Sequence, residues 1–313
     1  MVITKPTRRT FKFLIAAMCA MTMSVLANVS ANAVVSAAWL EEHLTDPQVR
    51  VIEVSVVPGV FERGHIPGAF NLAWHTDLVD PIIRDIVDPE RFTQLLRAAG
   101  VNNDSTVVLY GDNNNWFAAW AAWVFNIYGV TDVRILDGGR ALWEAQQRPL
   151  SNRPTVHTAG DFSITATNPA LRARLVDVLG VVQGEEDAAI LDIRSPAEYE
   201  GRIFAPEGFQ ELAIRAGHIP GAVNVPWAQA VNADGTFKSV DELRALYAAV
   251  GIDGTRPVIV YCRIGERSSH TWFVLTHLLG YENVRQYDGS WTEWGNTVGV
   301  PISNPAGTVW GSN

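Results

Sequence analysis

The two halves of this 313-residue chain repeat one another, and this repeat limits the possible folds more than any other feature. Gly64–Ala69 reads Gly-His-Ile-Pro-Gly-Ala, and the same six residues return as Gly217–Ala222. From Val107 to Trp143, matched residues of the two halves stay 151 positions apart without a gap. A repeat of this length predicts two similar domains in tandem, which also suits the length of the chain.

Each half alternates short β-branched apolar runs with helical patterns. In the first half we expect strands at 51–57, 107–110 and 133–136, and helices at 37–44, 91–99, 116–128 and 141–146. Strands that alternate with helices predict a mostly parallel sheet flanked by helices. The fold class is therefore α/β, with two such domains. Ligands of these sheets bind outside the carboxyl ends of the strands.

Composition sets the expected domain boundaries. Residues 1–33 predict a signal peptide, because a basic segment (Lys5, Arg8, Arg9 and Lys12) precedes an apolar segment and an Ala-Asn-Ala cleavage site. The first domain covers 34–148, a linker rich in Pro and polar residues covers 149–170, the second domain covers 171–303, and 304–313 form a tail.

The leader predicts export to the periplasm or the medium. Its apolar segment is too short for a stable membrane span, so no membrane anchor is expected. The pair Arg8-Arg9 resembles a twin-arginine signal, and we favour that route over the general secretory route.

Removal of the leader changes the charge and the cysteine content. The net charge falls from −9 to −13, because four positive and no negative charges are lost. Such an acidic protein is a poor partner for nucleic acid or an anionic membrane surface. Cys19 is also lost, so Cys262 remains alone and is either an inert buried residue or a reactive thiol.

Cys262 lies where chemistry is expected. The apolar run Val258–Tyr261 ends at this cysteine, and a polar loop then leads into a helical pattern at 271–279. A helix N-terminus favours an anion, and Arg263 and Arg267 flank the thiol. We therefore expect Cys262 to be a nucleophile that is partly ionised at neutral pH.

The repeat permits an internal comparison. At the register of Cys262–Arg267, the first half has Gly111–Trp116, which contains neither a cysteine nor an arginine. The first domain is thus expected to be inactive and to serve as a structural partner and pocket wall.

With both halves considered, residues 36–303 resemble the tandem-domain rhodanese sulfurtransferases. Three segments carry the resemblance beside the six-residue Cys262–Arg267 loop: an N-terminal signature, a C-terminal signature and a D-x-R segment, at 61–72, 284–294 and 192–199. The resemblance implies that Cys262 takes the outer sulfur of thiosulfate as a persulfide and passes it to cyanide or a thiol. No cofactor is implied beyond this covalent intermediate. Small-molecule donors and acceptors are the implied partners.

The resemblance also suggests the donor site. Arg263 and Arg267 would hold the sulfonate oxygens, with Ile264, Gly265 and Glu266 completing the loop. Two positions depart from the pattern of thiosulfate enzymes, in which the loop reads Cys-Arg-Lys-Gly. Ile264 stands where a second cation is expected, and Glu266 adds a negative charge.

A third departure concerns the D-x-R segment. In vertebrate-type rhodaneses a donor-binding arginine follows four positions after the arginine of that segment, and here Glu198 stands there. Arg194 or Arg202 is the candidate replacement. The alternative for Arg194 is a structural ion pair with Asp192.

Other residues have simpler interpretations. His65 and His218 are expected to be structural, and Trp116, Trp120 and Trp123 to lie in the core or the domain interface. His270 and His277 share a helix face without a third ligand, so no metal site is predicted.

Rival functions remain open at this point. Cysteine-dependent phosphatases and arsenate reductases also place a cysteine and an arginine at the two ends of an anion-binding loop. Those enzymes need a C-x5-R loop, however, and Cys262–Arg267 is one residue shorter. A 3-mercaptopyruvate sulfurtransferase is the alternative within the family. A persulfide carrier that delivers sulfur to a protein partner is the non-enzymatic alternative.

Overall fold

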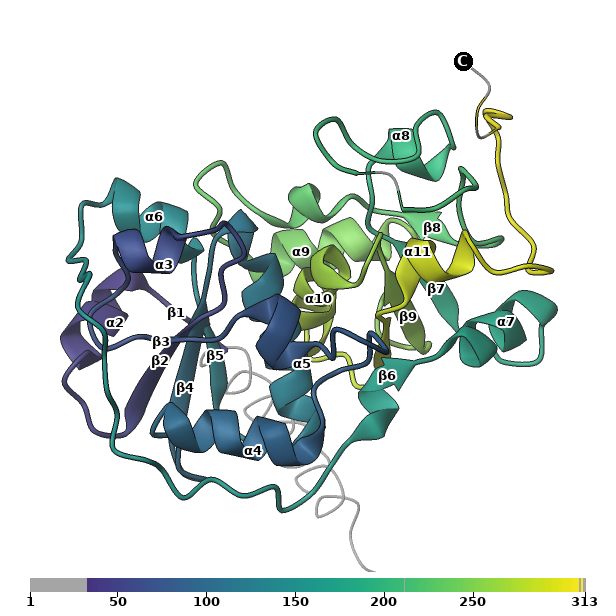
Figure 1. Ribbon diagram of the computed structural model, residues 1–313. Coiled ribbons are helices and arrows are strands. Elements are labelled where there is room, and N and C mark those ends of the chain that lie inside the picture. Colours follow the sequence, from purple (N-terminus) through teal and green to yellow (C-terminus); the bar gives the residue numbers. More distant parts are fainter. Residues whose placement is uncertain (1–32, 211, 310, 312–313) are drawn as a thin grey trace, which may run out of the picture.

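The computed structural model describes residues 33–210, 212–309 and 311 (Figure 1). The predicted signal peptide therefore lies outside the described residues, apart from Ala33. The two domains lie side by side, the first in purple and blue, the second in green and yellow (Figure 1).

Each domain contains a five-stranded sheet in which every strand pair is parallel. The first sheet consists of β1 (Val34–Val35), β2 (Val49–Glu53), β3 (Phe70–Asn71), β4 (Thr106–Tyr110) and β5 (Val133–Leu136), in the order β1-β5-β4-β2-β3. The second consists of β6 (Arg172–Ala173), β7 (Ala189–Asp192), β8 (Val223–Asn224), β9 (Val258–Tyr261) and β10 (Val284–Tyr287), in the order β6-β10-β9-β7-β8. The shared order confirms two similar α/β domains.

Helices flank both sheets. The first domain has α2 (Ala37–His43), α3 (Val60–Arg63), α4 (Pro89–Ala98), α5 (Trp116–Ile127) and α6 (Gly139–Ala145). The second has α7 (Leu175–Gln183), α8 (Pro196–Tyr199), α9 (Val240–Ala248), α10 (Glu266–Phe273) and α11 (Ser290–Trp294). Shorter helical turns are η1 (Trp74–Leu78), η2 (Asn113–Asn115), η3 (Pro169–Leu171), η4 (Trp227–Ala230) and η5 (Val274–Leu278).

Two predicted elements differ from the structure. The strand expected to reach residue 57 ends at Glu53, because the N–H groups of Val56 and Val57 donate to the Asp112 carboxylate rather than to a strand. The helix expected from 271 already begins at Glu266 and continues as a π-helical turn in η5.

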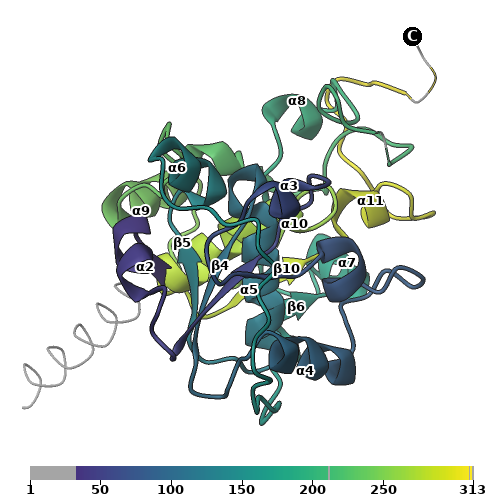
Figure 2. The ribbon, with the colours of Figure 1, turned by 60° about the vertical axis from the view of Figure 1, so that its left-hand side comes forward.

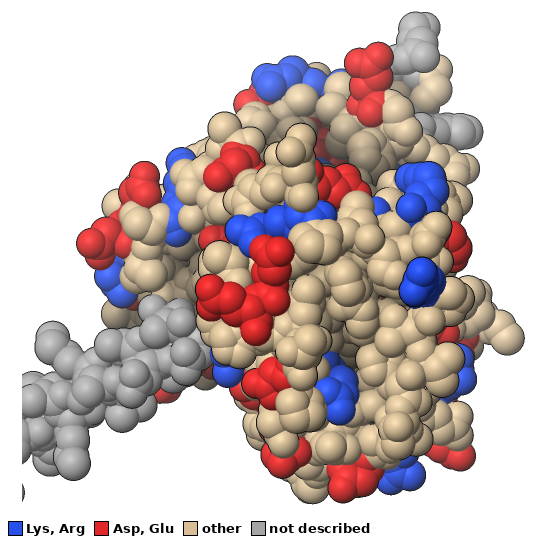
Figure 3. Space-filling model, turned by 90° about the vertical axis from the view of Figure 1, so that its left-hand side faces the viewer, with Lys and Arg blue, Asp and Glu red and all other residues tan. Residues whose placement is uncertain are grey.

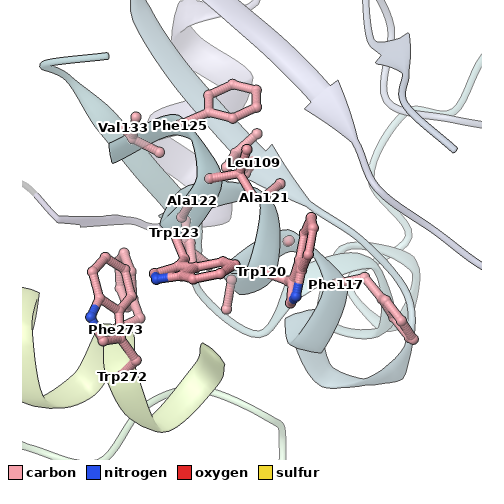
Figure 4. Packing of buried hydrophobic residues seen from close by; sticks show 14 of the residues in the cluster. Leu109, Phe117, Trp120, Ala121, Ala122, Trp123, Phe125, Val133, Trp272 and Phe273 are labelled. Carbon is pink, nitrogen blue, oxygen red and sulfur yellow. The ribbon is translucent and has the colours of Figure 1, made fainter. Parts of the chain in front are cut away.

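Helices α5 and α10 form the interface between the domains (Figures 1 and 2). Ten of the twelve residues of α5 are buried, as are all eight of α10. Trp120 and Trp123 of α5 belong to the same apolar cluster as Trp272 and Phe273 of α10 (Figure 4). The prediction that these tryptophans lie in the core or the interface is confirmed. Because α10 begins directly after the Cys262 loop, this interface also fixes the loop.

The segment 149–168 connects the domains without a helix or a strand of its own. His65 and Ser151 exchange two backbone hydrogen bonds of 2.8 Å, which hold its start against the first domain. The Asn168 N–H donates to the Ile127 carbonyl at 2.7 Å and holds its end.

The surface mixes both signs of charge. On the face shown in Figure 3, basic and acidic side chains lie next to one another rather than forming one basic patch. In the part of the chain that the structure describes, none of the helices combines the length and the apolar character needed to cross a bilayer.

Candidate active site

Cys262 follows the last residue of β9, at the carboxyl edge of the second sheet. Its N–H donates to Ser290 Oγ at 3.1 Å, and its Sγ accepts the Gly265 N–H at 3.1 Å. Gly265 has φ +100°, and a Cβ at this position would lie 2.9 Å from the Asp288 carbonyl oxygen. Only glycine suits this turn, which brings the backbone N–H onto the sulfur.

The thiol lies in surroundings that oppose its ionisation. Cys262 is fully buried, and Glu266 Oε2 lies 3.4 Å from Sγ. Burial first, and the Glu266 charge second, raise the pKa of the Cys262 thiol, although Arg267 and hydrogen bonds from Ser268 act in the opposite direction. The expectation of a partly ionised resting thiol is therefore wrong, because neither the full burial of Cys262 nor its contact with Glu266 can be predicted from the local sequence.

Arg267 is already occupied by a carboxylate. Its two terminal nitrogens donate to Glu198 at 3.1 and 3.0 Å, and its Nε lies 3.6 Å from Glu266 Oε1. Burial opposes ionisation of Glu198, yet the hydrogen bonds and charge of Arg267 hold the Glu198 pKa below its ordinary value. Glu198 thus fixes the orientation of Arg267 and neutralises much of its charge, although Arg267 still lines the cavity described below.

Arg263 is the second buried cation of the loop. Its Nη1 donates to the Gln210 carbonyl at 2.6 Å, and its guanidinium lies 5.1 Å from the centre of the Phe209 ring. Among the described residues, no carboxylate lies within 4.0 Å of Arg263. Its charge is therefore available to an anion.

A cavity of about 290 Å³ adjoins these groups. It is lined by Trp116, Ser195, Pro196, Glu198, Pro206, Phe209, Pro226, Trp227, Ala228, Arg263, Glu266 and Arg267. Trp116 comes from α5 of the first domain, and its ring meets that of Trp227 edge-on at 4.9 Å. The first domain therefore supplies a wall of the cavity, as we predicted from the comparison of the two halves.

An insertion forms the outer wall. Four positions separate Phe61 from His65 in the first domain, whereas nineteen separate the equivalent Tyr199 from His218. The aromatic ring stacks on the histidine in both cases, at 3.9 and 3.7 Å, and both histidines bond backbone carbonyls. The extra residues carry Pro206 and Phe209 to the cavity.

The first domain also contacts the back of the loop. Arg84 donates to the Ile264 carbonyl and, at 3.3 Å, to the Asp288 carbonyl. Ile264 itself packs against the interface cluster instead of facing a donor. Arg84 was not among the predicted site residues, because nothing in its local sequence signals a contact with a loop 180 residues away.

Comparison with known proteins agrees with this geometry. The family model for the rhodanese-like domain matches residues 36–146 and 178–297. The chain belongs to the rhodanese family.

Relatives in this family carry sulfur-transfer names. Over 272 residues, the chain is 51% identical to "Sulfur carrier protein TtuD" of Thermus thermophilus, covering 86% of this chain and 95% of that protein. It is 50% identical over 272 residues to "Putative thiosulfate sulfurtransferase" of Mycobacterium tuberculosis, covering 87% and 97%. The fold matches the crystal structure of Escherichia coli SseA, described under 3-mercaptopyruvate sulfotransferases, with TM-score 0.70, 32% identity and coverage of 83% and 99%. General sulfurtransferase activity follows from these relatives.

Arg194 belongs to a buried network in the second rhodanese domain. Its Nη2 lies 2.6 Å from Asp192 Oδ2 and donates to the Gly217 carbonyl at 2.7 Å. The Tyr261 hydroxyl donates to the same carboxylate at 2.6 Å and accepts the Ile219 N–H at 3.2 Å. Arg194 is 1% exposed and does not line the cavity. This geometry favours the ion pair over a role in donor binding.

The first rhodanese domain builds the same network from different positions. Arg140 Nη1 lies 2.8 Å from Glu53 Oε1, and the guanidinium also donates to the Gly64 carbonyl. The Tyr110 hydroxyl donates to Glu53 and accepts the Ile66 N–H at 2.9 Å. Because this domain has no cysteine, the network serves the fold and not the chemistry.

The remaining candidates lie away from the reaction centre. Arg202 is exposed and pairs with Glu200. His270 is buried and His277 is half-buried, each against aromatic rings, and desolvation lowers their pKa values to about 3 and about 4. Among the described residues, no group of three or more His, Cys, Asp or Glu side chains is arranged for a metal ion.

The paired networks predict equal structural roles for Arg194 and Arg140. Arg194→Met and Arg140→Met should each lower the free energy of unfolding by about 3–5 kcal/mol, because each leaves a buried carboxylate unpaired. Urea denaturation followed by tryptophan fluorescence measures this. Arg194→Lys, which keeps the charge, should lose less. A donor-binding role for Arg194 would instead raise the KM for thiosulfate and leave the stability unchanged.

Proposed function

We propose that the protein is a thiosulfate sulfurtransferase that transfers a sulfane sulfur through a Cys262 persulfide to cyanide or a thiol. One observation carries this proposal: the Cys262 sulfur lies in a short cradle beside a small cavity in which Arg263 lacks a carboxylate partner among the described residues. A dianionic donor fits this combination of an unpaired cation and a buried nucleophile.

The proposed reaction has two half-reactions. In the first, Cys262 Sγ attacks the outer sulfur of thiosulfate, the donor S–S bond breaks, and sulfite leaves with the bonding electron pair. In the second, the acceptor attacks the terminal persulfide sulfur and the electron pair returns to Cys262. The Gly265 N–H, which already bonds Sγ, stabilises negative charge there in both steps. No cofactor takes part.

Two features bear on the rival functions. The C-x4-R spacing from Cys262 to Arg267 gives a cradle shorter than the C-x5-R loop of phosphatases, and Arg267 is held by Glu198. A carrier role is the second candidate, and the name of the TtuD relative favours it. A carrier would form the persulfide without releasing thiocyanate when cyanide is added.

Export is a separate proposal that rests on residues 1–33 alone. A basic segment, an apolar segment and an Ala-x-Ala site support it. Fractionation of cells that express the full chain or a chain starting at Val34 tests it. Equal amounts of both in the cytoplasm would contradict export.

The donor preference is testable by steady-state kinetics. Activity with thiosulfate should exceed that with 3-mercaptopyruvate, because Arg263 stands where the loops of thiosulfate enzymes have arginine. Cys262→Ala should abolish both activities while the circular dichroism spectrum stays unchanged. Turnover in that variant, or a preference for 3-mercaptopyruvate, would contradict the proposal.

Arg263 should act on the donor rather than on the acceptor. Arg263→Ala should raise the KM for thiosulfate about 10–100-fold, the effect of losing one charged hydrogen bond, and change the KM for cyanide much less. Arg202→Ala is the matched control, because this arginine does not line the cavity and pairs with Glu200 at the surface. An equal rise in both KM values would show that Arg263 does not select the donor.

A further inference from the structure

Glu266 is a buried carboxylate in direct contact with the nucleophile. Its side chain is 4% exposed, and its Oε2 lies 3.4 Å from Cys262 Sγ. Among the described residues, the thiol is the only hydrogen-bond donor to this carboxylate, and Arg267 is the only cation within 4.0 Å. One oxygen thus faces a cation, whereas the other faces the S–H group.

The surrounding charges leave this carboxylate poorly neutralised. The terminal nitrogens of Arg267 are bound to Glu198 of α8, so only Nε faces Glu266, at 3.6 Å. Arg263, the other cation lining the cavity, bonds the Gln210 carbonyl. Trp116 of α5 and Trp227 of η4, which complete this side, carry no charge.

Charge balance therefore requires a shared proton. If Glu198, Glu266 and Cys262 were all ionised, three negative charges would surround Arg267, in a buried site. Three like charges at such short range repel one another strongly, so the site keeps one proton on one of these three groups. In the resting site this proton lies on sulfur and points to Glu266 Oε2.

We propose that Glu266 is a catalytic residue that takes the Cys262 proton during persulfide formation and returns it when the sulfur is delivered. This inference rests on the proposed sulfur transfer. When Sγ attacks the donor, the S–H proton moves to Glu266 Oε2, the new Cys–S–S⁻ group forms, and sulfite leaves with the electron pair of the broken S–S bond. When cyanide takes the terminal sulfur, the electron pair returns to Sγ and Glu266 returns the proton.

The number of protons exchanged with solvent distinguishes this cycle from one without Glu266. The protein, and not the solvent, holds the proton between the two half-reactions. Without a carboxylate at position 266, the proton of the thiol must leave the protein, to solvent or with the departing sulfite, when the persulfide anion forms.

Glu266→Gln tests the proposal, with thiosulfate as the probe in a single turnover. At a pH at which the thiol is protonated but released sulfite is not, wild type should release no proton to an indicator dye as sulfite forms, and E266Q should release about one per site. Glu266→Asp, which keeps a carboxylate, should retain the proton. Glu200→Gln, a surface carboxylate paired with Arg202, is the matched control and should behave as wild type.

A second readout needs no sulfur transfer. The thiolate absorbance, taken as the difference from Cys262→Ala, should develop at lower pH in E266Q than in wild type, because the carboxylate no longer repels the thiolate. Equal titrations, or release of a full proton by wild type, would overturn the role of Glu266. If thiosulfate yields no sulfite with wild type, the proposed function fails, and the titration still decides whether Glu266 controls the thiol proton.

Discussion

The ion pair between Arg267 and Glu198 determines which partners remain for Arg263 and Glu266, the other charged residues that line the cavity. Because both terminal nitrogens of Arg267 face Glu198, this arginine fixes the loop to α8, and much of its charge is neutralised by that carboxylate. Arg263 is left as the cation for an anionic substrate. Glu266 is left with a single guanidinium nitrogen and the thiol as neighbours, which opposes a resting thiolate and leads to proton sharing with Cys262.

The two domains of the tandem repeat share one architecture, but only the second carries the nucleophile. Both domains keep the strand order and a buried carboxylate–tyrosine–arginine network, although the arginine comes from α6 in one and from the segment that follows β7 in the other. The first domain lacks the nucleophile but contributes Trp116 to the cavity and Arg84 to the back of the loop. The packing of α5 on α10 brings these contributions together, so the site belongs to both domains.

Much of this organisation follows from the sequence. The repeat and the alternation of strands and helices predict the two α/β domains, and the run Val258–Tyr261 places Cys262 at a strand end. Pairings between distant residues did not follow, because local patterns carry no information about them. Glu198 meets Arg267 across 69 positions, and Arg84 meets Ile264 across 180. The charge of Glu266 was visible, but its direction toward the sulfur depends on the Gly265 turn. Full burial of the thiol and this contact with Glu266 raise the pKa of Cys262, so the predicted partial ionisation was wrong.

The central claim is that Cys262 carries sulfur as a covalent persulfide. Mass spectrometry of the intact protein after brief exposure to thiosulfate and removal of excess donor tests this most directly. The account predicts a mass increase of one sulfur atom, located on the peptide that contains Cys262, lost on addition of cyanide and absent from Cys262→Ala. An unmodified protein that still converts thiosulfate and cyanide to thiocyanate would contradict it.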